Sequence, residues 1–402
     1  MMGKSYGLRR RLGRIRQRVT GDDLDMLRNR VAELSGEVST LAAQLRQSGW
    51  QPPAAAEVGL LSDFRLRGGT TASIAQEAQV QSAAGISTAL IHVQSGVTNS
   101  IMGFSDHIRS ALEFPGVCAV SPRSETHVRL LIIRHPHVIA TSAPTLERLT
   151  ADQVVVVANH AAVDAEGSWH YRVALVDQRA REKFGVTPEW APISPVVRAS
   201  ILAQNHRDIR LAADDWVNIF GTVPTTTPRT GFVDEKPVIG RHSRPEPEKW
   251  PATAGGILAA YPDSSDYRVE VLGGAEIPEQ ILGAVPAAWH VQPFGAEEPA
   301  AFLQRIDFWV YMHHHSWREA FGRAIMEALA AGCVVVLPGY LREIFGEAAL
   351  YAEPSEVLAL VNRYWEDQEA YLEQSRRGQL FAAEHGPTRH LQRLQELGVS
   401  AS

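Results

Sequence analysis

The sequence predicts an α/β protein built from two parallel, doubly wound sheets. Short apolar runs of strand length alternate with helical stretches in both halves of the chain, the pattern typical of βα units. A stretch rich in Pro and Thr, residues 222–230, separates the two series. With 402 residues the chain is long enough for two domains of ordinary size, each with its own core.

Composition excludes several classes of function. The net charge of −6 gives no support to nucleic-acid binding. Cys118 and Cys333 stand far apart in apolar settings without a CxxC pattern, which favours a reducing compartment. No apolar run reaches the length of a membrane span, and the basic N-terminus lacks an apolar signal-peptide region. We therefore expect a cytoplasmic protein.

Residues 1–50 differ from the rest and predict a basic amphipathic helix followed by a short coiled coil. Apolar residues between positions 24 and 45 alternate spacings of three and four, which indicates a seam of about three heptads and hence a homodimer. A single amphipathic helix packed on its own domain is the alternative. Between residues 8 and 19 the same spacing runs among arginines, which favours peripheral binding to an anionic membrane surface or, alternatively, a disordered basic tail.

The first domain is predicted over residues 57–228. A short strand is followed by a loop that contains Gly68 and Gly69 and then by a helix, so the backbone can approach a ligand closely at this loop. The expected strands are 58–61, 88–93, 128–133 and 154–158, and the expected helices include 71–84 and 173–184.

The second domain is predicted over residues 229–375. Its expected strands are 237–240, 267–272, 289–292, 308–312 and 333–337. Residues 376–402 are predicted to form C-terminal helices, interrupted near Gly386 and Pro387, that cross back to the first domain.

Two glutamates, Glu319 and Glu327, are the most informative feature of the chain. They flank Phe321 and Gly322 between two predicted strands, so Glu319 lies in a loop and Glu327 in the second turn of a helix. The carboxyl end of a parallel sheet is where such folds bind ligands. Backbone N–H groups at the helix start suit a phosphate or a sugar hydroxyl, and carboxylates accept hydrogen bonds from paired hydroxyls.

In these segments the chain resembles retaining glycosyltransferases of the GT-B fold, family 4. The resemblance is carried by Gly240-Arg241 with Lys249 downstream, by the glycine turn at Gly273, and by the paired-glutamate motif. It covers roughly residues 236–355, extends to residues 57–220 only through the architecture and the Gly68-Gly69 loop, and does not include residues 1–50. It implies two Rossmann-like domains facing a cleft.

The resemblance also implies how a nucleotide diphosphate sugar is held. Arg241 and Lys249 would hold the diphosphate and stabilise charge on the leaving nucleotide, although the loop before Lys249 is wide and Pro-rich, so Arg244 is an alternative. Glu319 would contact the transferred sugar and Glu327 the ribose. The N–H groups of Phe321 and Gly322 would assist Glu319, and the nucleobase would lie near residues 291–295, which include Phe294.

Histidines supply the remaining candidates. The family carries a catalytic histidine after a strand of the first domain, which His160 fits, with His135 and His137 as competitors. Three adjacent histidines, 313–315, project in different directions, so the sequence predicts no metal site. His315 is instead expected to line the donor pocket. No cofactor is expected besides the donor substrate.

These observations together predict a glycosyltransferase that moves a sugar to an acceptor hydroxyl, with retention, on a lipid-linked or cell-envelope glycan. Two alternatives stay open: a non-catalytic scaffold with the glycosyltransferase architecture, and a GT-B sugar-nucleotide epimerase or hydrolase. The paired glutamates with Phe321-Gly322 argue against both. The sequence does not identify the sugar, the nucleobase or the acceptor.

Overall fold

The structure is a computed structural model that describes residues 54–66, 68–97, 103–121, 123–141, 146–163, 167–221 and 227–400, together with five helical positions nearer the N-terminus. Residues 1–53 and 54–402 form two separate compact units. In the first unit the helical positions include Leu27, Val31 and Leu34, whose side chains are all exposed. The rest of the predicted seam and the basic segment lie outside the described residues.

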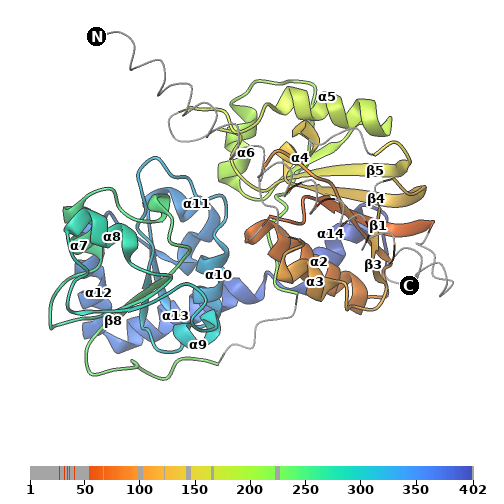
Figure 1. Ribbon diagram of the computed structural model, residues 1–402. Coiled ribbons are helices and arrows are strands. Elements are labelled where there is room, and N and C mark those ends of the chain that lie inside the picture. The colour runs from red at the N-terminus through yellow and green to blue at the C-terminus, as the bar shows by residue number, and fades with distance from the viewer. Residues whose placement is uncertain are drawn as a thin grey trace, which may run out of the picture. The chain divides into compact units, whose positions relative to one another are not determined.

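The second unit contains two fully parallel sheets, which confirms the predicted α/β architecture (Figure 1). The first sheet has the order β3-β2-β1-β4-β5-β6-β7 and the second β10-β9-β8-β11-β12-β13. The strands of the first sheet are β1 (Ala55–Ser62), β2 (Thr88–His92), β3 (Val117–Val120), β4 (Thr126–Arg134), β5 (Leu149–Ala158), β6 (Glu189–Pro192) and β7 (Arg210–Leu211). Those of the second are β8 (Val238–His242), β9 (Arg268–Leu272), β10 (Trp289–Gln292), β11 (Phe308–Val310), β12 (Val334–Leu337) and β13 (Leu350–Tyr351).

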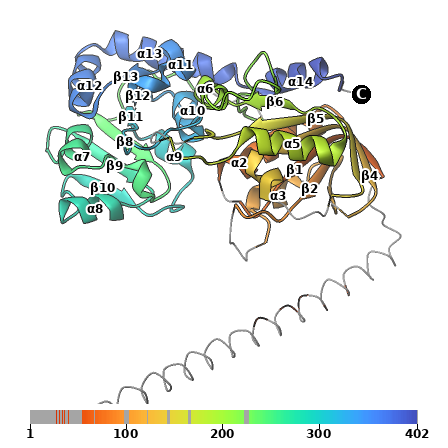
Figure 2. The same ribbon diagram turned by 90° about the horizontal axis from the view of Figure 1, so that it is seen from above.

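Helices cover both sheets, as a second view shows (Figure 2). With the first sheet belong α2 (Gly69–Ala83), α3 (Asp106–Ala111), α4 (Pro136–Thr141), α5 (Val173–Phe184) and α6 (Pro195–Leu202). With the second belong α7 (Ala254–Ala260), α8 (Glu276–Leu282), α9 (Pro299–Leu303), α10 (Arg323–Ala330), α11 (Arg342–Phe345), α12 (Val357–Glu366) and α13 (Gln368–Ala383). None of the described helices is long and apolar enough to cross a membrane.

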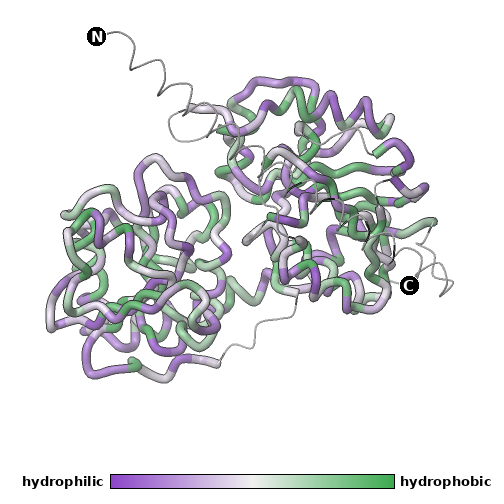
Figure 3. The backbone as a smooth tube through the Cα atoms, viewed as in Figure 1, coloured by the Kyte–Doolittle hydropathy of each residue, from purple (hydrophilic) through white to green (hydrophobic). Residues whose placement is uncertain are grey.

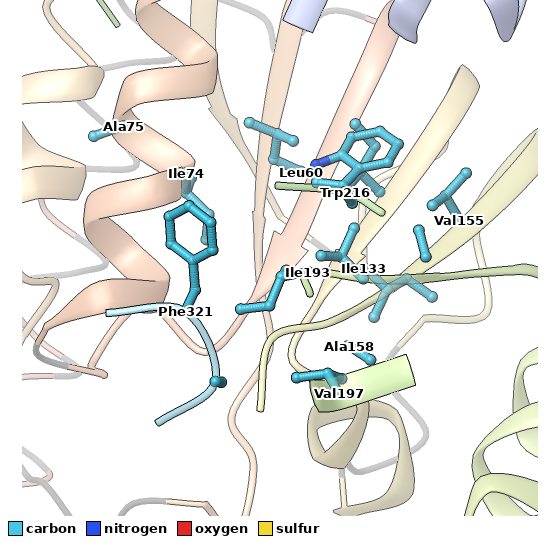
Figure 4. Packing of buried hydrophobic residues seen from close by; sticks show 14 of the residues in the cluster. Leu60, Ile74, Ala75, Ile133, Val155, Ala158, Ile193, Val197, Trp216 and Phe321 are labelled. Atoms are coloured by element: carbon cyan, nitrogen blue, oxygen red, sulfur yellow. The ribbon is translucent and has the colours of Figure 1, made fainter. Parts of the chain in front are cut away.

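Apolar sequence runs explain where the core lies. The central strands are buried on both faces, as expected for parallel sheets, and apolar residues follow them along the backbone (Figure 3). Leu60 and Ile133 come from neighbouring strands and pack with Trp216 in the larger cluster, which also includes Ile74 of α2 and Phe321 (Figure 4). Phe321 thus joins the core that holds the loop of the glutamate motif.

The last helix, α14 (Pro387–Glu396), packs against α2 of the first sheet, whereas α13 packs against α10 of the second. A buried charge lies under α14. Arg134 forms an ion pair with Glu77 of α2, Trp216 Nε1 donates to the same carboxylate at 2.8 Å, and His390 of α14 lies 3.8 Å from it. Burial would raise the pKa of Glu77, but Arg134 and its other partners outweigh burial and lower it.

Candidate active site

A cavity of about 500 Å³ lies where the strands of both sheets end. Its lining follows β1, β4, β5 and β6 of the first sheet and β8 and β11 of the second. In each sheet the strand order reverses between the first and fourth strands, β1 and β4 or β8 and β11, which is the position where open α/β sheets bind ligands. Six predicted site residues line this cavity: Gly69, His160, Lys249, Glu319, Phe321 and Gly322.

An ion pair forms the wall that the second sheet contributes. Lys249 Nζ donates to Glu319 Oε2 at 2.8 Å, and the Tyr311 hydroxyl donates to the same oxygen at 2.9 Å. Lys249 also donates to the Tyr311 hydroxyl at 3.0 Å and lies 4.5 Å from the ring centroid of Trp317. Burial would raise the pKa of Glu319, but the Lys249 charge and these hydrogen bonds outweigh burial and hold that pKa below its usual value.

The backbone next to Glu319 is shaped by Gly322. This residue caps α10 with a φ of 82°, in the left-handed region that favours glycine. A Cβ atom here would lie 2.4 Å from Ile325 Cδ1 and 3.3 Å from Glu319 Cγ. Helix α10 therefore begins at Arg323, and the N–H groups at its start lie at the cavity beside Glu319.

Histidines form much of the wall that the first sheet contributes. The rings of His135 and His160 lie 4.6 Å apart, and His170 lies 5.3 Å from His160. Burial lowers the pKa of His135 to about 4 and that of His160 well below its ordinary value, so both are neutral at pH 7. Within the described part of the chain, no atom forms a hydrogen bond with Nδ1 of either ring or with Oδ1 of neighbouring Asn159.

His135 also has an unusual backbone. It directly follows β4, and its φ of 84° is rare for a residue other than glycine. Such strained conformations concentrate at functional sites, where the surrounding structure imposes them. The structure thus brings both His135 and His160 to the cavity, whereas His137 does not line it.

Arg241 does not line the cavity. Its side chain is buried, with the guanidinium 3.7 Å from the Trp250 ring centroid, and it donates to the Lys249 carbonyl at 2.6 Å. Arg241 therefore supports the backbone of Lys249 from behind. Arg244, the alternative cation, lines the cavity instead and is half-exposed.

Five other predicted residues also lie outside the lining. Gly68 caps α2 with a φ of 114°, directly before Gly69. At Gly273 a Cβ atom would meet the Ser243 carbonyl oxygen at 1.8 Å, so packing between two loops requires glycine here. Phe294 is exposed on the loop after β10, and His315 lines a second cavity of about 480 Å³. Glu327 lies on α10, between Arg323 and His242.

Several lining residues were not identified from the sequence. Tyr311, which binds Glu319 but does not itself line the cavity, was also missed, because it belongs to an apolar run that indicates only a core strand. Asn159 lies between the apolar run of residues 154–158 and His160, and no motif in the sequence marks it as a site residue. Other residues of this kind include Thr70, Ser73, His170, Asn218 and Trp317. Across the described ranges, no group of three or more His, Cys, Asp or Glu residues has the arrangement of a metal site.

Comparisons with known proteins identify the fold. No sequence-family profile and no curated protein sequence matches the chain. Among solved structures, the Anabaena HepE protein in complex with UDP-glucose matches with a TM-score of 0.61 and 14% identity over 85% of this chain and 98% of that one. A sucrose-phosphate synthase from Thermosynechococcus elongatus matches with a TM-score of 0.59 and 13% identity over 85% and 98%. OtsA matches with a TM-score of 0.54 and 11% identity over 86% of this chain and 100% of that one. The chain therefore has the GT-B fold of these structures.

Proposed function

We propose that this protein is a retaining glycosyltransferase that transfers a sugar from a nucleotide diphosphate sugar to an acceptor hydroxyl. The observation that carries the proposal is the Lys249–Glu319 contact at a cavity located at the strand ends of both sheets. A cation beside the start of a helix suits a diphosphate, and a carboxylate held in place by a lysine and a tyrosine suits sugar hydroxyls.

Lys249 and Arg244 line the cavity, as do Arg318 and Arg323. Lys249 and Arg244 would stabilise the charge that develops on the leaving nucleotide. Arg241 would act through Lys249, by fixing its backbone. Glu319 would orient the transferred sugar, assisted by the N–H groups at Phe321 and Gly322. The neutral rings of His135 and His160 face the same space and can accept or donate hydrogen bonds to hydroxyls without adding charge.

In retention without a protein nucleophile, the leaving phosphate takes the proton of the acceptor hydroxyl on the same face of the sugar. The protein then contributes orientation and charge stabilisation. Nucleotide specificity would depend on the loop around Phe294, and the acceptor would enter beside the histidine wall.

A panel of UDP-, GDP- and TDP-linked sugars tests the proposal. Nucleotide release that increases with a hydroxyl acceptor supports a transferase. Release that is independent of acceptor indicates a hydrolase, and an altered sugar without release indicates an epimerase. If the protein bound none of these nucleotide sugars, the proposed enzyme activity would be overturned and a non-catalytic scaffold favoured.

A matched pair of variants localises the donor site. Lys249→Met should weaken donor binding about tenfold or more, because a buried charged contact to the diphosphate is lost. Lys236→Met removes an exposed lysine of the same domain that lies outside the cavity lining and whose Nζ donates to the Ser265 carbonyl, and should leave donor binding unchanged. If both substitutions changed the donor affinity equally, the diphosphate would not be bound by Lys249.

We also propose that the N-terminal unit joins two copies of the chain and binds an anionic membrane surface, which would bring a lipid-linked or envelope acceptor to the site. Leu27, Val31 and Leu34 have coiled-coil spacing and are exposed on their helix. Val31→Glu with Leu34→Glu should convert a dimer to a monomer in analytical ultracentrifugation, whereas Thr40→Glu should not. Deleting residues 1–50 should abolish sedimentation with anionic vesicles; unchanged mass and vesicle binding would refute this part.

A further inference from the structure

His242 connects the second sheet to the second glutamate of the motif. It is the last residue of β8, and its side chain is buried. Its Nδ1 atom lies 2.9 Å from Trp309 Nε1 of the neighbouring strand β11, and its Nε2 atom lies 3.2 Å from Glu327 Oε2 on α10. A continuous hydrogen-bonded path therefore runs from the interior of the sheet to Glu327.

Trp309 determines which atoms donate and which accept along this path. An indole N–H can only donate, so His242 Nδ1 must accept from Trp309. The proton of the neutral imidazole is then on Nε2, where it faces the Glu327 carboxylate. Trp309 is fully buried, and the Phe302 ring lies 6.0 Å from the imidazole, edge to face. The ring of His242 is thus fixed in both orientation and tautomer.

Glu327 is held at both of its carboxylate oxygens. His242 binds Oε2, and Arg323 Nε, one turn earlier on α10, donates to Oε1 at 2.9 Å. Burial would raise the pKa of Glu327, but His242 and Arg323 outweigh burial and lower it. Another titratable neighbour in the described part of the chain is His107 of α3, which interacts electrostatically with both Arg323 and Glu327. An ionised carboxylate still has lone pairs free for a pair of hydroxyls.

We propose that His242 is a positioning residue that aims the Glu327 carboxylate at the ribose hydroxyls of the donor nucleotide, with Trp309 fixing the imidazole tautomer. This inference rests on the proposed function, because it requires a donor nucleotide whose ribose reaches Glu327, beside the cavity. It assigns a role to a buried histidine that the paired-glutamate motif does not include.

Calorimetric titration of variants against ligands with and without the ribose hydroxyls tests the proposal. The ligands are UDP and GDP and their 2′,3′-dideoxy analogues. For wild type, removing the hydroxyls should weaken binding. His242→Phe should weaken binding of the ribonucleotide about tenfold and leave binding of the dideoxy analogue unchanged. His242→Gln, whose amide can donate from a similar position, should retain most of the affinity.

Trp309→Phe should act in the same direction as His242→Phe but more weakly, because the imidazole stays and only its tautomer is released. His206→Phe, at a partly exposed histidine outside the cavity, is the matched control and should change nothing. If His242→Phe fails to fold, His242→Gln and Trp309→Phe carry the same test.

Equal weakening of ribonucleotide and dideoxy analogue in every variant would show a purely structural role and overturn the inference. An unchanged affinity for both would overturn it as well. Failure of wild type to bind either nucleotide is a different result, since it would overturn the proposed function first.

Discussion

The wall that the second sheet contributes to the cavity carries charges that pair with one another, whereas the wall of the first sheet carries neutral rings with buried, unpaired nitrogen atoms. Lys249 and Glu319 lie 2.8 Å apart and share the Tyr311 hydroxyl. His135 and His160 are neutral, and within the described residues nothing binds their Nδ1 atoms.

The two walls are suited to ligands of different charge. Paired charges hold each other in position before any ligand arrives, so little reorganisation is needed when a charged donor binds. The histidine rings instead face the cavity without charge, and their unpaired Nδ1 atoms are themselves buried, which is costly. The first wall therefore suits an uncharged polyhydroxyl partner and the second a charged one.

The largest expected effect comes from the charged wall. Glu319→Gln removes the charge that pairs with Lys249 and should lower turnover on the order of 100-fold, because the sugar loses an oriented acceptor. Chromatographic assay of nucleotide release from the donor measures it. Glu366→Gln, at an exposed position on α12, is the control; a similar loss there, or none at Glu319, would contradict the assignment.

A smaller effect is expected from the backbone that shapes this wall. Gly322→Ala places a Cβ at positive φ and against Ile325, which should cost about 1–2 kcal/mol of unfolding free energy and displace Glu319. Urea unfolding and the donor KM both report it. Gly255→Ala, where a Cβ meets open space inside α7, should be neutral or slightly stabilising. Equal stability of the two variants would show that the Gly322 turn is unstrained.

The neutral wall should respond more mildly. His160→Ala should lower kcat about tenfold, since one hydrogen-bonding group is lost while the paired charges stay. His137→Ala, at a histidine near this wall but outside the cavity lining, provides the comparison. Donor titrations should give nearly the same Kd for His160→Ala as for wild type; a much weaker Kd would place the donor diphosphate against this wall.

The neutrality of this wall predicts a dependence of stability on pH. The pKa of His135 falls from 6.5 to about 4 on folding, so the unfolded chain binds a proton that the folded chain does not between these values. Stability is therefore fully present above pH 6.5 and declines by up to about 1.4 kcal/mol per pH unit as pH falls toward 4. His135→Phe should flatten the decline in urea unfolding between pH 6.5 and 5. An unaltered slope would mean that the ring is already charged.

Much of the fold could be predicted because long apolar runs leave few choices. Helix α5 and strand β10 have the predicted bounds, and the central strands differ only at their ends. The sequence did not predict β3, β6, β7 or β13, which have two to four residues each. Strands this short lie at or next to the sheet edges and pair through tertiary contacts, so they carry little periodic signal of their own.

Site residues that belong to a sequence motif could be predicted. Contacts between segments far apart in the sequence could not. Lys249 and Glu319 were both candidates, yet no spacing indicates that 70 positions apart they lie in contact. The sequence predicts Tyr311 as a core residue, because an apolar run does not show that its hydroxyl group binds a site residue. The burial of Arg241 under Trp250 was equally hidden, since it depends on how the loop after β8 folds back.

The return of α14 to the first sheet has a consequence for the order of events during synthesis. Helix α14 contributes His390 to the buried surroundings of Glu77 and Leu394 to the core of that sheet. Every residue of the second sheet leaves the ribosome before α14 does. The surface of α2 that α14 covers, although made early, therefore stays exposed until the second domain has been synthesised.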